Sequence, residues 1–355
     1  MANNILSVPK FERFVAGFEN SLVYIGLDVH KRSWSVALLR PDGEVADLTM
    51  PPEPHTLIQM LQSLPVTVGM IAQEAGPTGY GLARALQCAG LPITVAAPSR
   101  IPRPVSPTNK TDRLDCRKLA EFAASSLLRP IAIPSEHEEA FRILVRRRHQ
   151  LTDGLRRCKQ RIRGLLLINS AIEPDHLDHW SKAAIEQLHQ LELAPATRQT
   201  LNSHLRELAF LIEEQQSIDK QIKAQAITCG QQNRIERLKT ADGVGHVVAS
   251  TFAAELFHPE RFNRPEQVAA YLGLAPMVRE SGGKHDRGRL RPVGQKRLRS
   301  LLIEAAWIWR AKDEQAKAFY DRLLSRSSIP QKAIAALARK LAIKLWRLSL
   351  DPATA

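Results

Sequence analysis

Four acidic residues in the first third of the chain have types and positions that suit a metal site. Asp28 ends the apolar run 23–29, and Glu74 lies just past a second apolar run. Asp112 and Asp115 stand three residues apart on an expected helix, so their side chains share one face. Carboxylates that converge on a hard dication hold Mg²⁺ in enzymes that cut phosphodiesters. The four acids therefore predict a Mg²⁺ site, with Mn²⁺ as a substitute metal.

Each acid also has a simpler interpretation when it is taken alone. Asp112 and Asp115 fall in the first turn of a helix, where acids suit the macrodipole. Glu74 could be a surface residue. Asp28 is the strongest candidate, because a carboxylate on a buried strand is costly unless it is paired or binds a metal. The set is more persuasive than its members, since order and element type fit one site.

A serine in the last third could act as a nucleophile. Ser281 precedes Gly282 and Gly283, which let a backbone come close to a ligand. Positive charge surrounds it at Lys284, Arg287, Arg289 and Arg291. A serine beside phosphate and cations could attack phosphorus and form a phosphoserine link, which conserves the ester energy for rejoining. A basic loop that only touches backbone phosphates is the alternative, and the chemistry alone favours it.

Two further regions suggest phosphate contacts. Basic residues crowd one long helix, among them Arg146, Arg147, Arg156, Arg157, Arg161 and Arg163. An excess of one sign this large repels itself without a partner, so we expect it to bind a nucleic acid backbone. Gly243-Val244-Gly245 resembles a helix-hairpin-helix turn whose free amides, at Gly243 and Gly245, could hold a phosphate. A plain helix–helix turn explains it equally well.

Composition supports a nucleic acid partner and excludes several protein classes. The 355 residues suit two or three domains, and 50 Lys and Arg against 36 Asp and Glu give a net charge of +14. The four cysteines form no Cys-x-x-Cys pair, so we expect reduced thiols. No signal peptide, membrane span or complete ATP-binding loop is apparent. We therefore expect a soluble, cytoplasmic protein with no membrane partner and no ATPase activity.

The elements that must position these residues fall into an α/β part followed by a helical part. Residues 1–20 are expected to be a loosely held N-terminal extension. In residues 21–135, apolar runs predict strands at 23–29, 34–39, 44–50, 66–72 and 93–97. Helices are expected at 54–64, 80–88 and about 111–128, with a proline-rich loop at 98–108. Strands and helices that alternate in this way predict an α/β domain.

The remainder is predicted to be mainly helical. Heptad seams that start at Phe141 and Leu201 predict two long helices in a coiled-coil arm over 136–233, with a polar break at Arg148. A C-terminal domain over 234–330 is expected to hold helices at 265–271 and 294–312, separated by a polar loop at 279–292. A C-terminal helix and tail make up 331–355. The fold class is thus α/β plus α.

Several motifs together resemble the DEDD transposases of bacterial insertion sequences, the IS110 and IS1111 group. The first is Ile25-Gly26-Leu27-Asp28-Val29-His30-Lys31. The others, in order, are Glu74 in Gln-Glu-Ala-Gly-Pro-Thr-Gly, the run 110–115, Gly243-Val244-Gly245, the runs 262–263 and 271–276, Glu280-Ser281-Gly282-Gly283-Lys284, and the run from Leu298-Arg299 to Ala305-Ala306. The resemblance covers most of the chain in the right order.

This resemblance implies a mechanism that spacing does not show. It implies a RuvC or RNase H-like N-terminal domain with Asp28, Glu74, Asp112 and Asp115 as the metal-binding tetrad. It implies that Ser281 forms a covalent 5′-phosphoserine with DNA, which reverses the preference for a plain basic loop. A bridge RNA would pair with double-stranded donor and target DNA, and a homodimer or homotetramer would combine the two sites.

Two other functions remain open from the sequence. A RuvC-like metal-dependent endonuclease that hydrolyses DNA with water would need the four acids but not Ser281. A non-catalytic nucleic-acid-binding scaffold would need no metal. The lead-in at 1–20 is longer than is usual in the resembling family, and no role is assigned to it.

Overall fold

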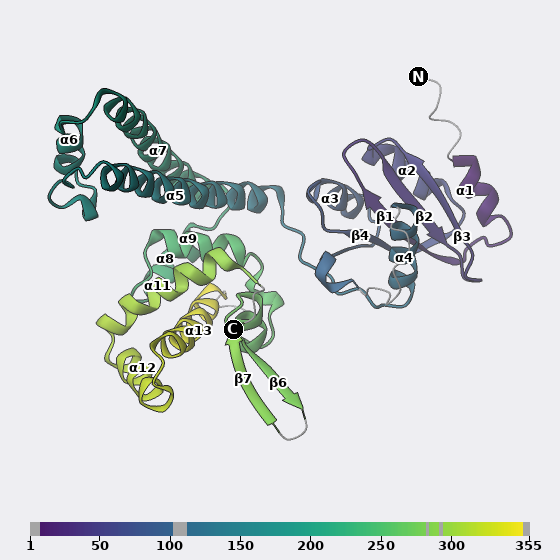
Figure 1. Ribbon diagram of the computed structural model, residues 1–355. Coiled ribbons are helices and arrows are strands. Elements are labelled where there is room, and N and C mark those ends of the chain that lie inside the picture. The colour runs from purple at the N-terminus through teal and green to yellow at the C-terminus, as the bar shows by residue number, and fades with distance from the viewer. Residues whose placement is uncertain (1–7, 102–111, 282–283, 291–293, 351–355) are drawn as a thin grey trace. The chain divides into compact units, whose positions relative to one another are not determined.

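The computed structural model describes residues 8–101, 112–281, 284–290 and 294–350, with residues 8, 112–113, 278–281 and 284–289 described by their backbone alone. The chain divides into two compact units, residues 1–135 and 136–355. The first unit ends where the sequence placed the end of the α/β part. Figure 1 shows a sheet with covering helices in the first unit and mostly helices in the second. The finer division of the chain into five segments remains a prediction.

The first unit is built on a five-stranded mixed sheet. Its strands are β1 (Leu22–Val29), β2 (Trp34–Leu39), β3 (Val45–Met50), β4 (Thr67–Glu74) and β5 (Ile93–Ala96). Their order in the sheet is β3-β2-β1-β4-β5. The first three strands pair antiparallel, and β4 and β5 run parallel to β1. The five strands predicted from the sequence are confirmed, but β4 continues to Glu74 instead of ending before it.

Helices cover both faces of this sheet. The helices are α1 (Val8–Val15), α2 (Pro54–Ser63), α3 (Gly81–Cys88) and α4 (Asp112–Ala124). Side chains alternate between faces along a strand. Ile25 and Leu27 therefore face a core shared with α1, α2 and α3, whereas Tyr24 and Gly26 face α4. Of the helices described in this unit, α4 is the one that packs on the face that carries Asp28.

Residues 8–15 of the N-terminal lead-in form a packed helix, so the expectation of a loose extension was wrong for this part, while residues 1–7 lie outside the described residues. Phe11 and Val15 of α1 are fully buried in the core on the α2 and α3 face. The spacing of four between these two residues places them on one side of the helix. The apolar positions were present in the sequence, but a helix of eight residues is too short to be recognised by its periodicity.

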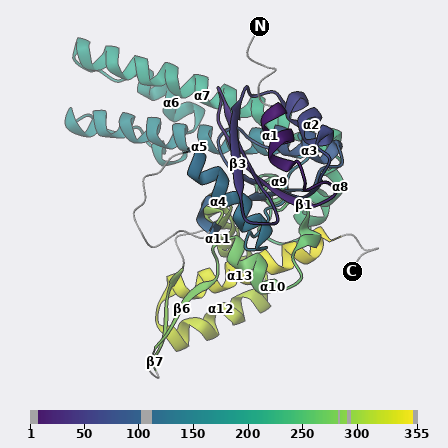
Figure 2. The same cartoon turned by 90° about the vertical axis from the view of Figure 1, so that its right-hand side faces the viewer.

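Two long helices form the start of the second unit. They are α5 (Glu136–Ile168) and α7 (Pro195–Thr228), and Figures 1 and 2 both show them side by side. The short α6 (Lys182–Gln190) lies between them in the chain and adds Ala184 and Leu188 to their common core. The polar break at Arg148 is explained by Asp219 of α7, whose Oδ1 accepts a hydrogen bond of 2.6 Å from Arg148 Nε. The seam therefore carries an ion pair where its apolar pattern stops.

The rest of the second unit packs six helices around one core. They are α8 (Gln232–Lys239), α9 (His246–Glu255), α10 (Pro265–Tyr271), α11 (Lys296–Lys312), α12 (Glu314–Ser327) and α13 (Pro330–Ser349). Buried residues of α13, such as Leu337 and Leu341, lie in the same core as Phe141 of α5 and Phe252 of α9. None of the described helices is long and apolar enough to span a membrane.

The polar segment expected to be a loop at 279–292 contains two strands, so that expectation was wrong. β6 (Pro276–Ser281) and β7 (Lys284–Leu290) pair antiparallel, and Figure 1 shows them as a hairpin. Basic and polar side chains are unusual in a strand that faces a core. A two-stranded hairpin has no buried face of its own to impose alternation, and this explains why the pattern gave no strand signal.

Candidate active site

Asp28 and Glu74 occupy adjacent positions on neighbouring parallel strands. Leu27 of β1 pairs with Gln73 of β4, so the next residue of each strand is Asp28 and Glu74. Both lie on the α4 face, because side chains alternate from one residue to the next. The Asp28 side chain is 20% exposed, and Glu74 is exposed as the last residue of β4. Two of the four predicted acids therefore lie side by side at the carboxyl ends of neighbouring strands, on the same face of the sheet.

A glycine in β1 lets α4 reach the sheet beside these acids. A Cβ built on Gly26 would lie 1.8 Å from the carbonyl oxygen of Cys116 and 2.7 Å from the amide nitrogen of Ala120. The backbone of α4 therefore touches β1 directly, two residues before Asp28. Asp115 immediately precedes Cys116 and is partly buried. The helix thus carries Asp115 to the face that holds Asp28 and Glu74.

An ion pair that was not predicted from the sequence joins α4 to β3, the edge strand next to β2. Arg117 of α4 donates from Nε to Oδ1 of Asp47 at 3.0 Å, and Asp47 is 4% exposed. Lys10 of α1 donates to the main-chain oxygen of Asp47. The sequence signal for this pair was an acid, Asp47, at a position of β3 whose side chain points inward. Asp47 thus holds the helix that carries Asp112 and Asp115.

The electrostatics of this edge are dominated by carboxylates. His30 Nε2 lies 3.2 Å from Oδ2 of Asp28. Burial, followed by the charges of Asp47 and Asp28, raises the pKa of the Cys116 thiol to about 11. Cys116 therefore stays protonated at neutral pH and is no nucleophile. The nearby negative charge that disfavours a thiolate would favour a bound cation.

The donor set fits a hard dication. Asp28, Glu74 and Asp115 offer carboxylate oxygens, the ligands that Mg²⁺ prefers. Among the described side chains, no three acidic, imidazole or thiol groups lie close enough together to hold a metal. Asp112 begins α4 one turn before Asp115, but its side chain lies outside the described atoms. The assignment of the tetrad therefore remains a prediction.

The candidate nucleophile lies at the tip of the hairpin. Ser281 ends β6 and is paired in register with Lys284, which begins β7. Gly282 and Gly283, which connect the two strands, lie outside the described residues. In the same register, Arg287 pairs with Val278. The backbone therefore holds Ser281 beside a lysine at the end of a two-stranded ribbon.

Two arginines of the basic helix serve the fold. Arg146 Nε and Nη2 donate to the two carboxylate oxygens of Glu255 on α9, at 2.8 and 2.9 Å. Arg142 Nη2 lies 3.3 Å from Glu255 Oε2. Burial opposes the charge of Glu255, but the hydrogen bonds and charges of Arg146 and Arg142 outweigh it and lower its pKa. Glu255 therefore occupies the guanidinium group of Arg146 that was predicted to bind nucleic acid.

Most of the other arginines on α5 also have acidic neighbours. Arg156 pairs with Asp153, Arg161 with Glu207 and Arg163 with Glu173. These pairs are largely exposed, so the arginines can still meet phosphates. The excess charge of the helix is thus partly neutralised within the protein, contrary to the assumption that it lacks partners.

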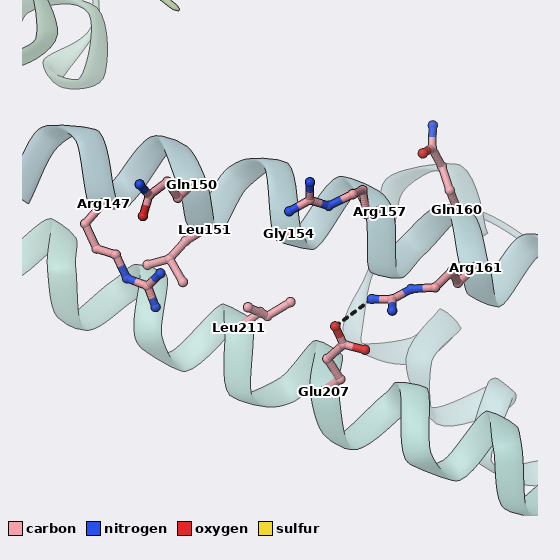
Figure 3. Close-up of a pocket in the computed structure, with 9 residues that line it drawn as sticks. All are labelled: Arg147, Gln150, Leu151, Gly154, Arg157, Gln160, Arg161, Glu207 and Leu211. Carbon is pink, nitrogen blue, oxygen red and sulfur yellow. Dashed lines mark hydrogen bonds and ion pairs between the residues drawn. The ribbon is translucent and has the colours of Figure 1, made fainter. Parts of the chain in front are cut away.

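Arg147 and Arg157 line an open groove of about 830 Å³ between α5 and α7. Figure 3 shows both on α5, with Arg161 reaching across to Glu207 of α7. In the part of the chain that the structure describes, no acidic partner of Arg147 or Arg157 is found. These two are the best placed of the predicted nucleic-acid-binding arginines.

The Gly-Val-Gly turn has a packing role at its first glycine. Gly243 has a φ of +80°, and a Cβ there would lie 2.4 Å from the carbonyl oxygen of Ala305 on α11. Gly245 precedes α9 and has open space around it. Close packing against α11 thus accounts for Gly243, while the predicted phosphate contact at Gly245 stays a prediction.

Comparison with known proteins supplies the family. A transposase model of the DEDD IS110 type matches residues 25–169, and a model described as the IS116/IS110/IS902 transposase family matches residues 235–321. The first match contains all four acids and the second contains Ser281. The chain belongs to the IS110 family of DEDD transposases.

Individual relatives carry transposase names. The transposase for insertion sequence element IS1533 of Leptospira borgpetersenii is 27% identical over 92% of this chain and 95% of its own length. That for IS1111A of Coxiella burnetii is 25% identical over 79% of this chain and 78% of its own. The Sinorhizobium fredii protein y4qE, a transposase by name, is 32% identical over 67% of this chain, which spans 57% of that relative. The mixed sheet of this transposase is consistent with a RuvC-like domain.

Proposed function

We propose that this transposase cuts and rejoins DNA through a serine ester, with a divalent metal held by the DEDD tetrad. The observation that carries the proposal is the edge of the sheet where Asp28 and Glu74 stand side by side under α4. Membership of a transposase family implies a DNA substrate and, generally, cleavage and rejoining. The RuvC-like assignment of residues 21–135, within the first unit, belongs to the same proposal.

The chemical step balances without an external energy source. The Ser281 hydroxyl oxygen forms a bond to phosphorus while the bond from phosphorus to the 3′ oxygen of the DNA breaks. The hydroxyl proton leaves with the 3′ oxygen, which becomes a free 3′ hydroxyl. The result is a 5′-phosphoserine. Attack by the 3′ hydroxyl of another strand reverses the step and rejoins DNA.

Asp28, Glu74, Asp112 and Asp115 would hold the metal. When bound, Mg²⁺ supplies Lewis-acid stabilisation of charge on the phosphate oxygens. The chain's own residues would do the remaining work. Lys284, whose backbone pairs with that of Ser281, and Arg287, whose backbone pairs with that of Val278, would supply positive charge to the hairpin. His30, which lies 3.2 Å from Asp28 Oδ2, would orient the Asp28 carboxylate. Arg289 and Arg291 extend the same positive charge along the chain.

A bridge RNA that pairs with donor and target DNA would choose the sequences, with the basic residues of α5 holding nucleic acid backbones. A homodimer or homotetramer would bring tetrad and serine together from different subunits. Arg147 and Arg157 support this role because they line the groove between α5 and α7.

The test is a cleavage assay on cognate DNA with guide RNA and Mg²⁺, read on a denaturing gel without proteolysis. We expect wild type to form a protein–DNA adduct. Ser281→Ala and Asp28→Ala should each lose it, as should wild type without metal. Ser325→Ala, at an exposed serine of α12, and Asp178→Ala, at an exposed acid between α5 and α6, are the matched controls.

Two outcomes would replace the proposal. Free nicked DNA from Ser281→Ala at the wild-type rate would favour a metal-dependent endonuclease that uses water. Nucleic acid binding that needs neither metal nor the acids, with no cutting at all, would leave a non-catalytic scaffold.

A further inference from the structure

A second hollow adjoins the tetrad on the opposite face of the sheet. It has a volume of about 300 Å³. Gln73, Trp34 and Leu82 line it and are 1%, 5% and 6% exposed, so they form its floor. The exposed residues His30 and Lys31 belong to its rim, together with Pro52 and Thr78. The pocket is therefore apolar at depth and basic at its mouth.

The floor holds the side-chain amide of Gln73. Among the residues that the structure describes, neither Oε1 nor Nε2 of Gln73 has a hydrogen-bond partner, although the side chain is almost fully buried. Buried polar groups normally find partners, and each exception calls for an explanation. An amide offers one acceptor and two donors. The Gln73 amide can thus form two hydrogen bonds with a ligand that carries a hydrogen-bond donor next to an acceptor.

Residues of the pocket are direct neighbours, in the chain, of residues of the candidate active site. Gln73 immediately precedes Glu74, and alternation along β4 puts their side chains on opposite faces of the sheet. Val29 of the pocket likewise follows Asp28. His30 lines the rim and contacts Asp28 Oδ2 at 3.2 Å. A DNA strand whose phosphate lies at the tetrad would pass the mouth of this pocket.

We propose that the pocket receives one nucleobase, extruded from the DNA strand next to the phosphate that is cut, and that Gln73 reads its edge. This proposal rests on the proposed function, because it assumes DNA at the tetrad. Enzymes that extrude a base hold it between aromatic and apolar side chains and read it by hydrogen bonds. Trp34, Leu82 and Val29 supply such walls, and Gln73 supplies the hydrogen-bonding group.

The chemistry of the lining favours a base over other occupants. A free phosphate would meet an apolar floor and a neutral amide, whereas a base has a flat apolar face and a polar edge. Lys31 at the rim suits the phosphate that the base carries with it. Glutamine pairs in bidentate fashion with adenine, so we expect adenine to be preferred.

The experiment varies one base at a time at each position within about five nucleotides of the cut, a span that brackets the single extruded nucleotide expected of base flipping. The guide RNA is changed in step, so that pairing remains complete. We measure the initial rate of adduct formation with Mg²⁺, and separately the binding of the same duplexes in EDTA. Wild type should prefer one base at one position on the order of 10-fold, and an abasic site there should lose the preference.

Gln73→Leu and Gln73→Met keep most of the volume but remove the amide, and they should flatten the preference at that position only. Gln87→Leu, at an exposed glutamine of α3, is the control and should keep it. The thermal unfolding temperature of the Gln73 variants should be unchanged or raised, because the lost amide has no hydrogen-bond partner in the described part of the chain. The preference and its loss in these folded variants would support the pocket.

Equal rates and affinities for all bases in wild type, or a preference that both Gln73 variants retain, would overturn the proposal. A different outcome is that the wild-type protein cuts no DNA and yet binds one base at this position more tightly in EDTA, with that difference in affinity lost in the Gln73 variants. The proposed cleavage chemistry then fails, and the base pocket is supported. If adducts form without any such preference, only the pocket fails.

Discussion

Gly26 is the residue at which the candidate active site is assembled, because only a residue without a side chain lets α4 touch β1. The same strand carries Asp28 two positions later, so one short motif supplies both a candidate ligand and the space for the helix that carries Asp112 and Asp115. In the sequence, Gly26 looks like a weak point in an apolar strand. The structure shows that it has a specific partner, the backbone of Cys116 and Ala120.

Gly26→Ala should displace α4 and separate Asp115 from Asp28. We expect a loss of at least about 1–3 kcal/mol in the unfolding free energy, the usual cost of overpacking, and a large fall in metal-dependent cutting. Urea unfolding and the adduct assay measure the two effects. Gly81→Ala at the start of α3 is the control, since a Cβ there meets nothing within 4 Å. If both variants were equally stable and active, close contact between α4 and β1 would be excluded.

At the scale of elements, the buried carboxylate of Glu255 joins α9 to α5. Its two arginine partners come from a helix more than a hundred residues earlier in the chain. Because Arg142 and Glu255 are both buried, removal of Glu255 takes away the carboxylate with which Arg142 and Arg146 pair. The base of the arm is thus fixed to the C-terminal helices by charge as well as by apolar packing.

Glu255→Ala should lower the unfolding free energy by about 3–5 kcal/mol at pH 7, the usual cost of breaking a buried pair from one side. Because the pKa of Glu255 is lowered in the folded protein, the carboxylate stabilises the fold above its unfolded pKa, near the ordinary value of 4.5. That contribution is lost as the pH falls below 4.5 and through the lowered folded pKa. Urea unfolding of wild type and variant across this range measures it.

The matched control is Glu236→Gln on α8, whose partner Lys239 is exposed. It should cost about 0–1 kcal/mol, as exposed pairs do, with little dependence on pH. An equally small effect from Glu255→Ala would show that apolar packing alone holds α5 to α9.

At the scale of the whole molecule, the charge of +14 should govern affinity for nucleic acid. Each phosphate contact releases counterions, so the logarithm of the binding constant should fall linearly with the logarithm of salt concentration. Arg147→Gln with Arg157→Gln should reduce the magnitude of that slope by about 2, roughly one for each lost contact. Titrations at several salt concentrations give the slope.

The control removes two charges elsewhere, at the exposed residues Lys182 and Lys332, by substitution with glutamine. A slope that changes equally in both double variants would show that net charge, and not the groove between α5 and α7, carries the effect. An unchanged slope in the arginine variant would remove that groove from the nucleic acid interface.

Local patterns were sufficient for much of this architecture. Strands and long helices repeat apolar residues with periods that depend on the element itself, so β1 to β5, α5 and α7 could be predicted from nearby residues alone. The motifs around Asp28, Glu74 and Ser281 pointed to the transposase family. The hairpin β6–β7 escaped because it has no buried face to impose an alternating pattern, and α1 escaped because a helix of eight residues gives too few repeats.

Contacts between distant residues were decided only by the tertiary structure. The sequence shows Asp47, Arg146 and Gln73 as single residues. In the folded chain Asp47 pairs with Arg117, Arg146 pairs with Glu255, and Gln73 lines a pocket. The spacing of apolar residues along the chain indicates which side chains are buried. It does not indicate which other side chains they contact. The sequence by itself therefore determined the family and the candidate ligands, while the folded chain decided which charges are already neutralised and which buried amide is left for a ligand.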